Sequence, residues 1–548
     1  MNSFWPFALL LAGSSSWQDQ IEKALFDNTF DGIHQFNWFD YSLLIPYFTL
    51  LGILSFYGIH RYEVMWTYWR NRKNTPAGPK CLFDPLPPVT IQLPLYNERY
   101  VVARLLEEVT RIDYPRELLQ IQVLDDSTDE THALAARLCA QYRAQGFPVD
   151  YVHRTNRDGF KAGALENGLK TATGEFIAVF DADFVVPRDF LQKTIHPFTD
   201  PKIGLVQTRW SYLNRYYNLL TEVQGIMLDG HFILEHNARY RAGQFFNFNG
   251  TAGILRKSMI ADAGGWEHDT LTEDSDLSYR AQLKGWRFAY LPEVECPSEL
   301  PFDTRGFQIQ QSRWAKGLTQ VAVKLLRRIL DTDLPWRIKL EALWHLTPNI
   351  CYPLMTLVTA LMLPVMIVRF YMGWQQLLII DLPLLLATFA SVIFFYVYAQ
   401  FERDRSTWKR SVLMMPVLMA AGAALTVINT RAVMEALMGV QSAFVRTPKY
   451  AITGTQNRLN KRAEQKAKYR SHAGWLPFLE FGIGTYFLGA VFYAINTANF
   501  LAVPMLTIFV AGYYWASLST LQRDLRDRLA FQRARRLEAR AAEQSTVI

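Results

Sequence analysis

Cysteine is scarce in this sequence. The chain of 548 residues holds four, Cys81, Cys139, Cys296 and Cys351, and no two of them form a C-x-x-C pair. Such widely spaced cysteines supply neither a disulfide framework nor the clustered thiolates of a structural zinc site. We therefore expect no covalent or zinc staple, and a water-exposed part that works in the reducing cytosol.

A basic surface for nucleic acid is also missing. The net charge is +7, from 57 basic and 50 acidic residues. The basic excess lies beside apolar segments, in 61–80, 403–410, 461–470 and 523–540. This placement is typical of cytoplasmic flanks of membrane spans, so we predict a lipid bilayer as partner and no nucleic acid.

The first apolar stretch, 4–12, is only about nine residues long, whereas a spanning helix needs about 20. No basic residues precede it, so it is at most a weak interfacial or signal-like segment. Residues 41–59 are long and apolar enough to span, and Arg61, Arg70 and Lys73 follow them. Because basic flanks stay inside, we predict an outward N-terminus and a cytosolic middle region.

Half of the residues are hydrophobic and a fifth are charged, which indicates apolar blocks on either side of a soluble one. Four later segments have the length of a span: 344–368, 377–398, 475–493 and 500–518. Segment 412–428 is at the lower limit, and if it crossed, the basic 461–470 would face outside. We therefore place it at the cytoplasmic interface and read 523–540 as a membrane-surface helix.

Between these blocks, apolar runs alternate with helical patterns. We expect strands at 89–93, 119–124, 150–153, 176–180 and 203–208. Helices are expected at 99–112, 131–144 and around 219–239, and another begins at Thr272 as N-cap. The alternation predicts an α/β domain with a doubly wound, mostly parallel sheet, whose ligand loops share one edge.

The central strand ends in two acids, in the sequence FIAVFDADF of 176–184. Asp181 and Asp183, two residues apart at the carboxyl end of a strand, can face one hard divalent cation. Alone, a D-x-D is more often a solvated loop, because short motifs occur by chance. The functional interpretation therefore depends on the rest of the pattern.

Five signals stand in one order: Asp125-Asp126, Lys161 with Gly163, D-x-D, Thr272-Glu273-Asp274, and Gln310-x-x-Arg313-Trp314. Together they resemble the processive inverting family-two glycosyltransferases, the group of cellulose, hyaluronan and chitin synthases. The stretches VLDDSTD, NRDGFKAGAL, VQTRW, FNGTAG, AGGW, TEDSDL, LKGW, SELP and QQSRW look like the plant cellulose-synthase-like branch that makes mannan, glucomannan and the xyloglucan backbone. The resemblance is dense over 86–320 and loose in the membrane part.

The resemblance implies a GT-A-like catalytic domain at 86–335. It also implies an N-terminal segment with one span at 1–85, a spanning and interfacial region at 336–520, and a basic cytosolic tail at 521–548. The donor, a nucleotide sugar, would be bound by the following residues: Glu98, Asp125, Asp126, Lys161, Asp181 and Arg313. Asp181 and Asp183 would hold Mg²⁺ or Mn²⁺, which stabilises charge on the leaving diphosphate. From the residues alone, Asp125-Asp126 can instead cap the helix at Thr131.

In the family Asp274 takes the proton of the acceptor hydroxyl, and Glu273 orients the helix. One displacement inverts the anomeric carbon, so an α-linked donor gives a β-linked product. The acceptor side would consist of Phe246, Asn249, Gly250, Gln310, Arg313 and Trp314. Phe444, Thr447 and Lys449 resemble a gating loop that closes over the nucleotide, although Arg446 stands where a valine is typical.

We therefore expect a membrane-embedded polysaccharide synthase that uses UDP-glucose or GDP-mannose and passes its polymer through its spans. The alternatives are a non-processive enzyme that glycosylates a lipid and, more remotely, a non-catalytic transporter or scaffold. We expect the bacterial plasma membrane, or the Golgi membrane in a eukaryote. The sequence leaves the sugar, the linkage and any accessory subunit open.

Overall fold

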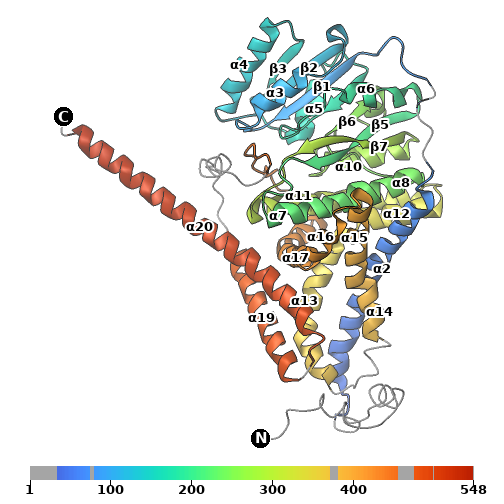
Figure 1. Cartoon of the computed structure of the whole chain (residues 1–548), viewed down its shortest axis with the longest axis vertical. Coiled ribbons are helices and arrows are strands. Elements are labelled where there is room, and N and C mark those ends of the chain that lie inside the picture. The colour runs from blue at the N-terminus through green and yellow to red at the C-terminus, as the bar shows by residue number, and fades with distance from the viewer. Residues whose placement is uncertain are drawn as a thin grey trace.

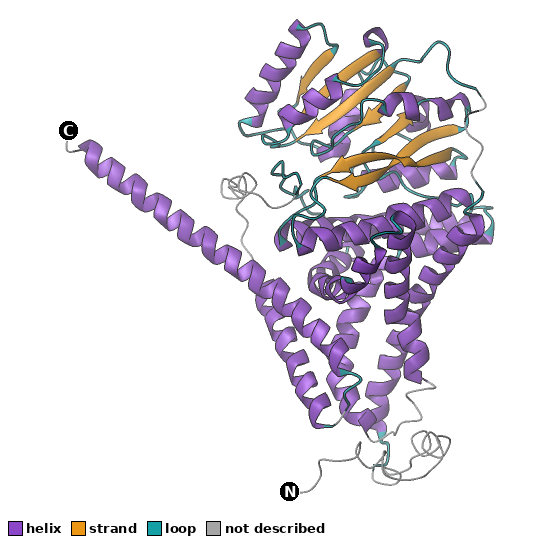
Figure 2. Ribbon diagram, in the orientation of Figure 1, coloured by secondary structure: helices purple, strands orange, loops and turns teal. Residues whose placement is uncertain are grey.

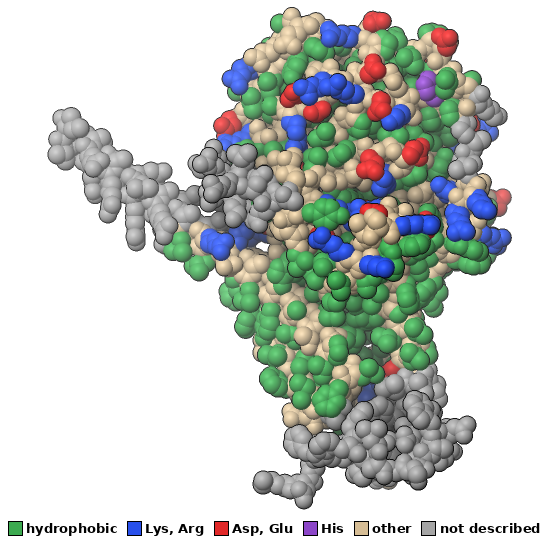
Figure 3. Space-filling model, viewed as in Figure 1, with side chains coloured by type: hydrophobic (Ala, Val, Ile, Leu, Met, Phe, Trp, Pro, Cys, Tyr) green, Lys and Arg blue, Asp and Glu red, His purple; other side chains and the backbone are tan. Residues whose placement is uncertain are grey.

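The computed structural model describes residues 34–74, 79, 81–370, 380–454, 474–497 and 499–546. It has three layers: an α/β domain, a layer of helices beneath it, and a bundle of long helices that points away from the domain (Figures 1 and 2). Hydrophobic side chains cover the surface of the bundle, and Lys and Arg side chains gather where the bundle meets the upper layers (Figure 3). This distribution is that of a membrane protein with a water-exposed domain.

The domain is built on one seven-stranded sheet of order β3-β2-β1-β4-β6-β5-β7. The strands are β1 (Val89–Leu95), β2 (Leu119–Asp125), β3 (Val149–His153), β4 (Phe176–Val179), β5 (Ile203–Tyr212), β6 (Gly253–Arg256) and β7 (Arg287–Ser298). All pairings are parallel except those of β6 with β4 and β5. The predicted mostly parallel sheet is thus confirmed, and β4 is buried along its whole length, as its unbroken apolar run indicates.

Helices pack on the sheet as the alternating pattern predicts. They are α3 (Val102–Thr110), α4 (Thr131–Ala144), α5 (Phe160–Leu169), α6 (Phe190–Thr194), α9 (Lys257–Asp262) and α10 (Glu273–Leu283), with short 3₁₀ turns η2 (Arg116–Leu118) and η3 (His196–Thr199). Helix α4 has the predicted bounds, but α3 begins later than expected. Asn97 has a left-handed backbone, and its side chain accepts from the Thr128 N–H at 2.9 Å. This contact with a neighbouring loop keeps 97–101 out of the helix.

The middle layer is helical and lies across the top of the bundle. It consists of α7 (Leu219–Asp229), the π-helical turn η4 (Gly230–Glu235), α8 (His236–Arg241), α11 (Thr304–Asp331), α12 (Trp336–Leu346), α16 (Trp408–Leu413) and α17 (Met415–Leu437). Buried Glu341 of α12 joins the layers, since its carboxylate bonds Arg239 Nε at 2.7 Å and His60 Nε2 at 2.9 Å. The middle layer is thereby held to the first long helix, α2 (Trp38–Asn71).

The bundle contains α2 (Trp38–Asn71), the turn η5 (Pro348–Ile350) with α13 (Cys351–Arg369), α14 (Leu382–Leu385) with η8 (Leu386–Ala390) and α15 (Ser391–Arg403), α19 (Leu476–Asn496) and the long α20 (Val503–Thr546). In the described part of the chain, five helices are long and apolar enough to cross a membrane: 38–71, 348–369, 382–403, 415–437 and 476–496. The predicted span at 344 starts too early, because Trp344 belongs to α12. The start of the one predicted at 377 lies outside the described residues.

Helix α17 is long and apolar enough to span a membrane. Helix α20, which the sequence predicts to cross at 500–518, is not among the five helices that meet this criterion. The contacts nevertheless support an interfacial α17. Arg410, just before it, bonds Glu222 of α7 at 2.8 Å, and Arg446, just after it, bonds Glu98 of the α/β domain at 2.6 Å. Both ends therefore contact the same side of the molecule. Figure 1 shows α17 nearly end-on while α13 and α19 run down the bundle.

We expect a cysteine at Met438, which is 65% exposed just beyond α17, to be shielded in intact cells. In a Cys81→Ser background, an impermeant thiol reagent should label Met438→Cys only after lysis, because we predict that both ends of α17 face the cytosol. Cysteine introduced at exposed Trp38, at the other end of the bundle, is the matched control and should be labelled in intact cells. Labelling of Met438→Cys before lysis would show that α17 crosses.

Candidate active site

A cavity of about 170 Å³ opens at the carboxyl ends of β1 and β4 and is closed from the other side by α11 and segment 444–449. Most of the predicted site residues line it: Glu98, Asp126, Lys161, Asp181, Asp183, Asn249, Gly250, Glu273, Asp274, Gln310, Arg313, Trp314, Phe444, Thr447 and Lys449. They come from distant parts of the chain. The fold thus brings the donor, acceptor and gating residues of the sequence prediction into one place.

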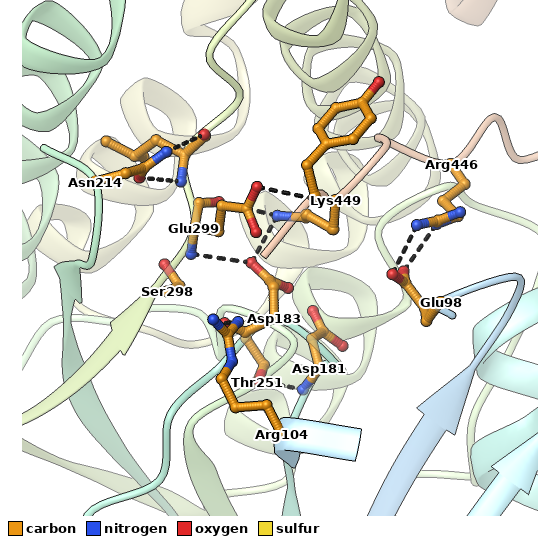
Figure 4. Close-up of polar contacts among 12 residues, drawn as sticks. Glu98, Arg104, Asp181, Asp183, Asn214, Thr251, Ser298, Glu299, Arg446 and Lys449 are labelled. Carbon is orange, nitrogen blue, oxygen red and sulfur yellow. Dashed lines mark hydrogen bonds and ion pairs between the residues drawn. The ribbon is translucent and has the colours of Figure 1, made fainter. Parts of the chain in front are cut away.

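The two aspartates after β4 are each paired with a lysine. Lys161 Nζ lies 2.5 Å from Asp181 Oδ1. Lys449 Nζ lies 2.6 Å from Asp183 Oδ2 (Figure 4). Burial lowers the pKa of Lys161, but Asp181 and Glu273 outweigh it and raise that pKa, so Lys161 stays charged. Two carboxylates that pair with cations at one wall of the cavity suit a hard divalent ion. A diphosphate can supply the remaining ligands of that ion.

The acid predicted to be the base lies in the first turn of α10. Burial, with the negative charge of Glu273 next, raises the pKa of Asp274 to about 7. A carboxyl with such a pKa suits proton transfer near neutral pH. Thr272 occupies the predicted N-cap position, but its side chain makes no capping hydrogen bond. It packs instead against Gly317 of α11, where an added Cβ would lie 2.5 Å from its methyl carbon.

Polymer synthesis at saturating substrate is expected to rise about tenfold from pH 6 to pH 8. With a pKa of about 7, Asp274 is about one-tenth ionised at pH 6 and about nine-tenths at pH 8, and only the carboxylate accepts a proton. Initial rates across this range, with donor binding measured at the same pH values, test this. A flat profile, or one that falls as pH rises, would contradict the assignment.

The acceptor residues come from α11 and from the loop before β6. Gln310, Arg313 and Trp314 line the cavity from successive turns of α11. Asn249 is fixed by His231 Nε2 and by His236 Nε2, each at 3.0 Å. Gly250 must be glycine, because its φ is +79° and an added Cβ would lie 2.8 Å from Asp274 Oδ2.

Two predicted site residues lie outside the cavity lining. Both carboxylate oxygens of Asp125 are used inside the fold, by the Ser127 N–H at 2.9 Å and the Tyr151 hydroxyl at 2.7 Å. Phe246 is 2% exposed and packs in the core under the sheet. We correct both predicted ligand contacts. The Asx-turn considered for this pair is present at Asp125, through the Ser127 N–H, but the Thr131 N–H is capped by Asp129 and not by Asp126.

Segment 444–449 lies inside the cavity. The Phe444 ring lies 6.0 Å from that of Phe160 and 4.3 Å from the Arg313 guanidinium carbon. Arg446 forms a two-pronged ion pair with Glu98, and Lys449 bonds Asp183 (Figure 4). The segment thereby neutralises two of the acids that the sequence assigns to the donor and metal.

Sequence reasoning assigned no role to four cavity residues: Tyr96, Arg157, Glu299 and Arg446. Arg157 stacks 3.3 Å above the Tyr96 ring. Glu299 holds the gating segment, because its carboxylate accepts from the Tyr450 N–H at 3.0 Å and its carbonyl accepts from Lys449. In the sequence, the SELP stretch contains Glu299, and Arg446 is conspicuous because it stands where a valine is typical. Only the geometry reveals the Tyr96–Arg157 stack.

Comparisons with known proteins show similarity to glycosyltransferases. The model of glycosyl transferase family group 2 matches residues 176–425. A probable glucomannan 4-beta-mannosyltransferase 11 of Oryza sativa subsp. japonica is 43% identical over 251 residues, 45% of this chain and 44% of the relative. Glucomannan 4-beta-mannosyltransferase 2 of Arabidopsis thaliana is 42% identical over 250 residues, 44% of this chain and 47% of the relative. The alignments thus span less than half the length of these curated relatives.

Among solved structures, one that the chain matches is a mannosyltransferase from Pyrobaculum calidifontis in complex with GDP-Man and Mn²⁺. It is 21% identical, its TM-score is 0.46, and the match covers 71% of this chain and 99% of that one.

Proposed function

We propose that this chain, which carries a family group 2 glycosyltransferase region, is a membrane-embedded inverting β-glycosyltransferase that builds a mannan-type or glucan-type polymer. The observation that carries the proposal is one cavity lined by a pair of cation-binding aspartates, a carboxyl with a pKa of about 7, and the Gln310-x-x-Arg313-Trp314 turn. A scaffold without catalysis would not need a buried carboxyl poised to exchange a proton near neutral pH.

The side chains divide the reaction between them. Asp126, which accepts from Arg154 Nε at 2.7 Å, would bind the nucleoside, and Lys161 with Arg313 would lie along the diphosphate. When bound at Asp181 and Asp183, a divalent ion such as Mg²⁺ or Mn²⁺ stabilises the charge on the leaving diphosphate. Asp274 takes the proton of the acceptor hydroxyl as its oxygen bonds the anomeric carbon, and Trp314 stacks on the acceptor sugar. The diphosphate departs from the opposite face, so the anomer inverts.

The relatives favour GDP-mannose over UDP-glucose as donor. Those quoted are named glucomannan 4-beta-mannosyltransferases, and their similarity to this chain exceeds 40% identity. We therefore propose a β-1,4-linked mannan or glucomannan as product. Because the identity covers less than half of each relative, the donor needs a direct test.

The position of the acceptor residues supports a polymer product. Helix α11 lies directly above the bundle (Figure 1), and we propose that a chain leaving Trp314 passes between the long helices. We propose a cytosolic catalytic domain in the bacterial plasma membrane, or in the Golgi membrane of a eukaryote.

Membranes that contain the protein should incorporate label from GDP-mannose into material that an endo-β-mannanase degrades. Parallel reactions with UDP-glucose, and digestion with a cellulase, identify the sugar. The inactive control is a matched preparation of Asp274→Asn. Label that partitions into organic solvent as one or two sugars on lipid would establish the glycolipid alternative, and no transfer from either donor would overturn the proposal.

A further inference from the structure

A second cavity, of about 760 Å³, lies at the junction of the bundle and the middle layer, apart from the active site. Its walls are the first turns of α7 and α11, the start of α17, and one side of α20 between Thr507 and Arg526. None of the predicted catalytic or gating residues lines it. A cavity of this size holds a molecule as large as a drug or a lipid chain.

The lining changes from apolar to basic along the cavity. Its deep part is formed by apolar and small side chains, such as Val223, Val417, Ala420 and Ile508. Arg305, Arg523 and Arg526 lie at the other end, with Asp303 as the only acid in the lining among the described residues. Arg523 pairs with Asp303, and the lining at this end as a whole remains basic, which suits an anionic ligand. Figure 3 shows basic side chains where α20 leaves the body of the protein.

The lining changes from apolar to basic at the depth where lipid head groups lie. Helix α20 starts at Val503 at the far end of the bundle, and Thr520 is about 26 Å further along it at 1.5 Å per residue. A bilayer core is about 30 Å thick, so the arginine end lies near the cytoplasmic boundary of the core. The deep end then lies among the lipid chains.

A buried hydroxyl in the cavity also lacks a partner. Thr520 is 6% exposed, and its Oγ1 makes no hydrogen bond with any described residue. A buried hydroxyl without a partner is destabilising, and an oxygen of a bound ligand would supply that partner. Nearby, the Asp303 carboxylate caps α11 by accepting from the Gly306 N–H at 2.9 Å. The basic end thus lies at the start of a 28-residue helix, where backbone dipoles add positive potential.

We propose that this cavity binds an anionic glycerophospholipid, with its phosphate between Arg305 and Arg526 and an acyl chain along α17 and α20. The same helix α11 carries Gln310, Arg313 and Trp314 two turns further on. The bound head group therefore lies about one and a half to two and a half turns of α11 from the acceptor residues. The binding itself is independent of the proposed sugar transfer.

Trp515 lines the cavity and provides a local probe. The full chain in detergent is titrated with phosphatidylglycerol whose acyl chains carry bromine, which quenches nearby tryptophan. Because the chain has 15 tryptophans, the signal of interest is the difference between the native protein and Trp515→Phe. We expect saturable quenching that Trp515→Phe loses, at concentrations about tenfold lower than for brominated phosphatidylcholine.

Three variants distinguish the contribution of the lipid phosphate from that of the acyl chain. The double variant Arg305→Gln with Arg526→Gln should weaken phosphatidylglycerol quenching about tenfold or more, since each basic side chain contributes on this scale at an anionic surface. Ala420→Leu should weaken both lipids by filling the acyl path. Lys409→Gln removes an exposed charge at the same level outside the cavity and should change neither. Elution volume and circular dichroism establish that each variant is folded.

Equal affinity for the two lipids, or quenching that survives in Trp515→Phe, would overturn the proposal. Displacement of the brominated lipid by a β-mannan oligosaccharide would instead assign the cavity to the polymer. Displacement of the brominated lipid by millimolar inorganic phosphate would show that the cavity binds anions in general and not a lipid.

Discussion

Replacing Asp274 by asparagine is expected to lower polymer synthesis at least about a hundredfold, the scale of a general-base contribution. Asparagine keeps the shape, and its oxygen can still accept the 2.7 Å hydrogen bond from the Ser275 N–H. It cannot take the proton of the acceptor hydroxyl. The first turn of α10 should therefore stay in place while the chemical step fails.

Two measurements distinguish this loss from misfolding. Initial rates with labelled GDP-mannose or UDP-glucose give the catalytic effect, and calorimetric titration with the nucleotide diphosphate gives binding, which should stay within about twofold. Asp189→Asn is the matched control, because Asp189 is exposed on the same domain and pairs only with Lys193 among the described residues. Near-normal turnover by Asp274→Asn would remove this residue from the role of base.

Replacing Asp183 by asparagine is expected to abolish the dependence of donor binding on a divalent ion. An amide oxygen is neutral, so the variant loses half of the charge that the two aspartates offer the ion. Donor affinity with Mn²⁺ should fall at least about tenfold, to the value that the native protein shows in a chelator. Polymer synthesis should fall to the level of the metal-free enzyme.

Lys449→Gln is the informative control, because it releases Asp183 from its 2.6 Å ion pair without altering a metal ligand. This variant should keep donor binding that depends on Mn²⁺, and bind the ion at least as tightly as the native protein. If Asp183→Asn kept the full metal dependence, or if a chelator left the native enzyme unaffected, the assignment of Asp181 and Asp183 to a cation would fail.

The α/β domain, the central strand and about half of the cavity lining follow from the amino-acid sequence alone. Period-two and period-3.6 patterns are local, so β4 and α4 could be predicted from the residues that form them. The carboxyl ends of parallel strands share one edge, and for this reason the strand pattern was enough to predict that Asp126 and Asp181 lie together. The order of the motifs supplied the acceptor side, from Gly250 to Trp314.

Tertiary contacts determine which of these side chains are free to meet a ligand. Asp125 and Asp126 are adjacent in the sequence, yet Ser127 and Tyr151 use the carboxylate of Asp125 while that of Asp126 faces the cavity. The pairing of Arg446 with Glu98 joins residues 348 positions apart, and no local pattern contains it. The same holds for α17, whose composition fits a span but whose two ends bond the same side of the molecule. Hydrophobic pattern measures how apolar a segment is, whereas its direction and its partners depend on contacts between segments that are distant in the chain.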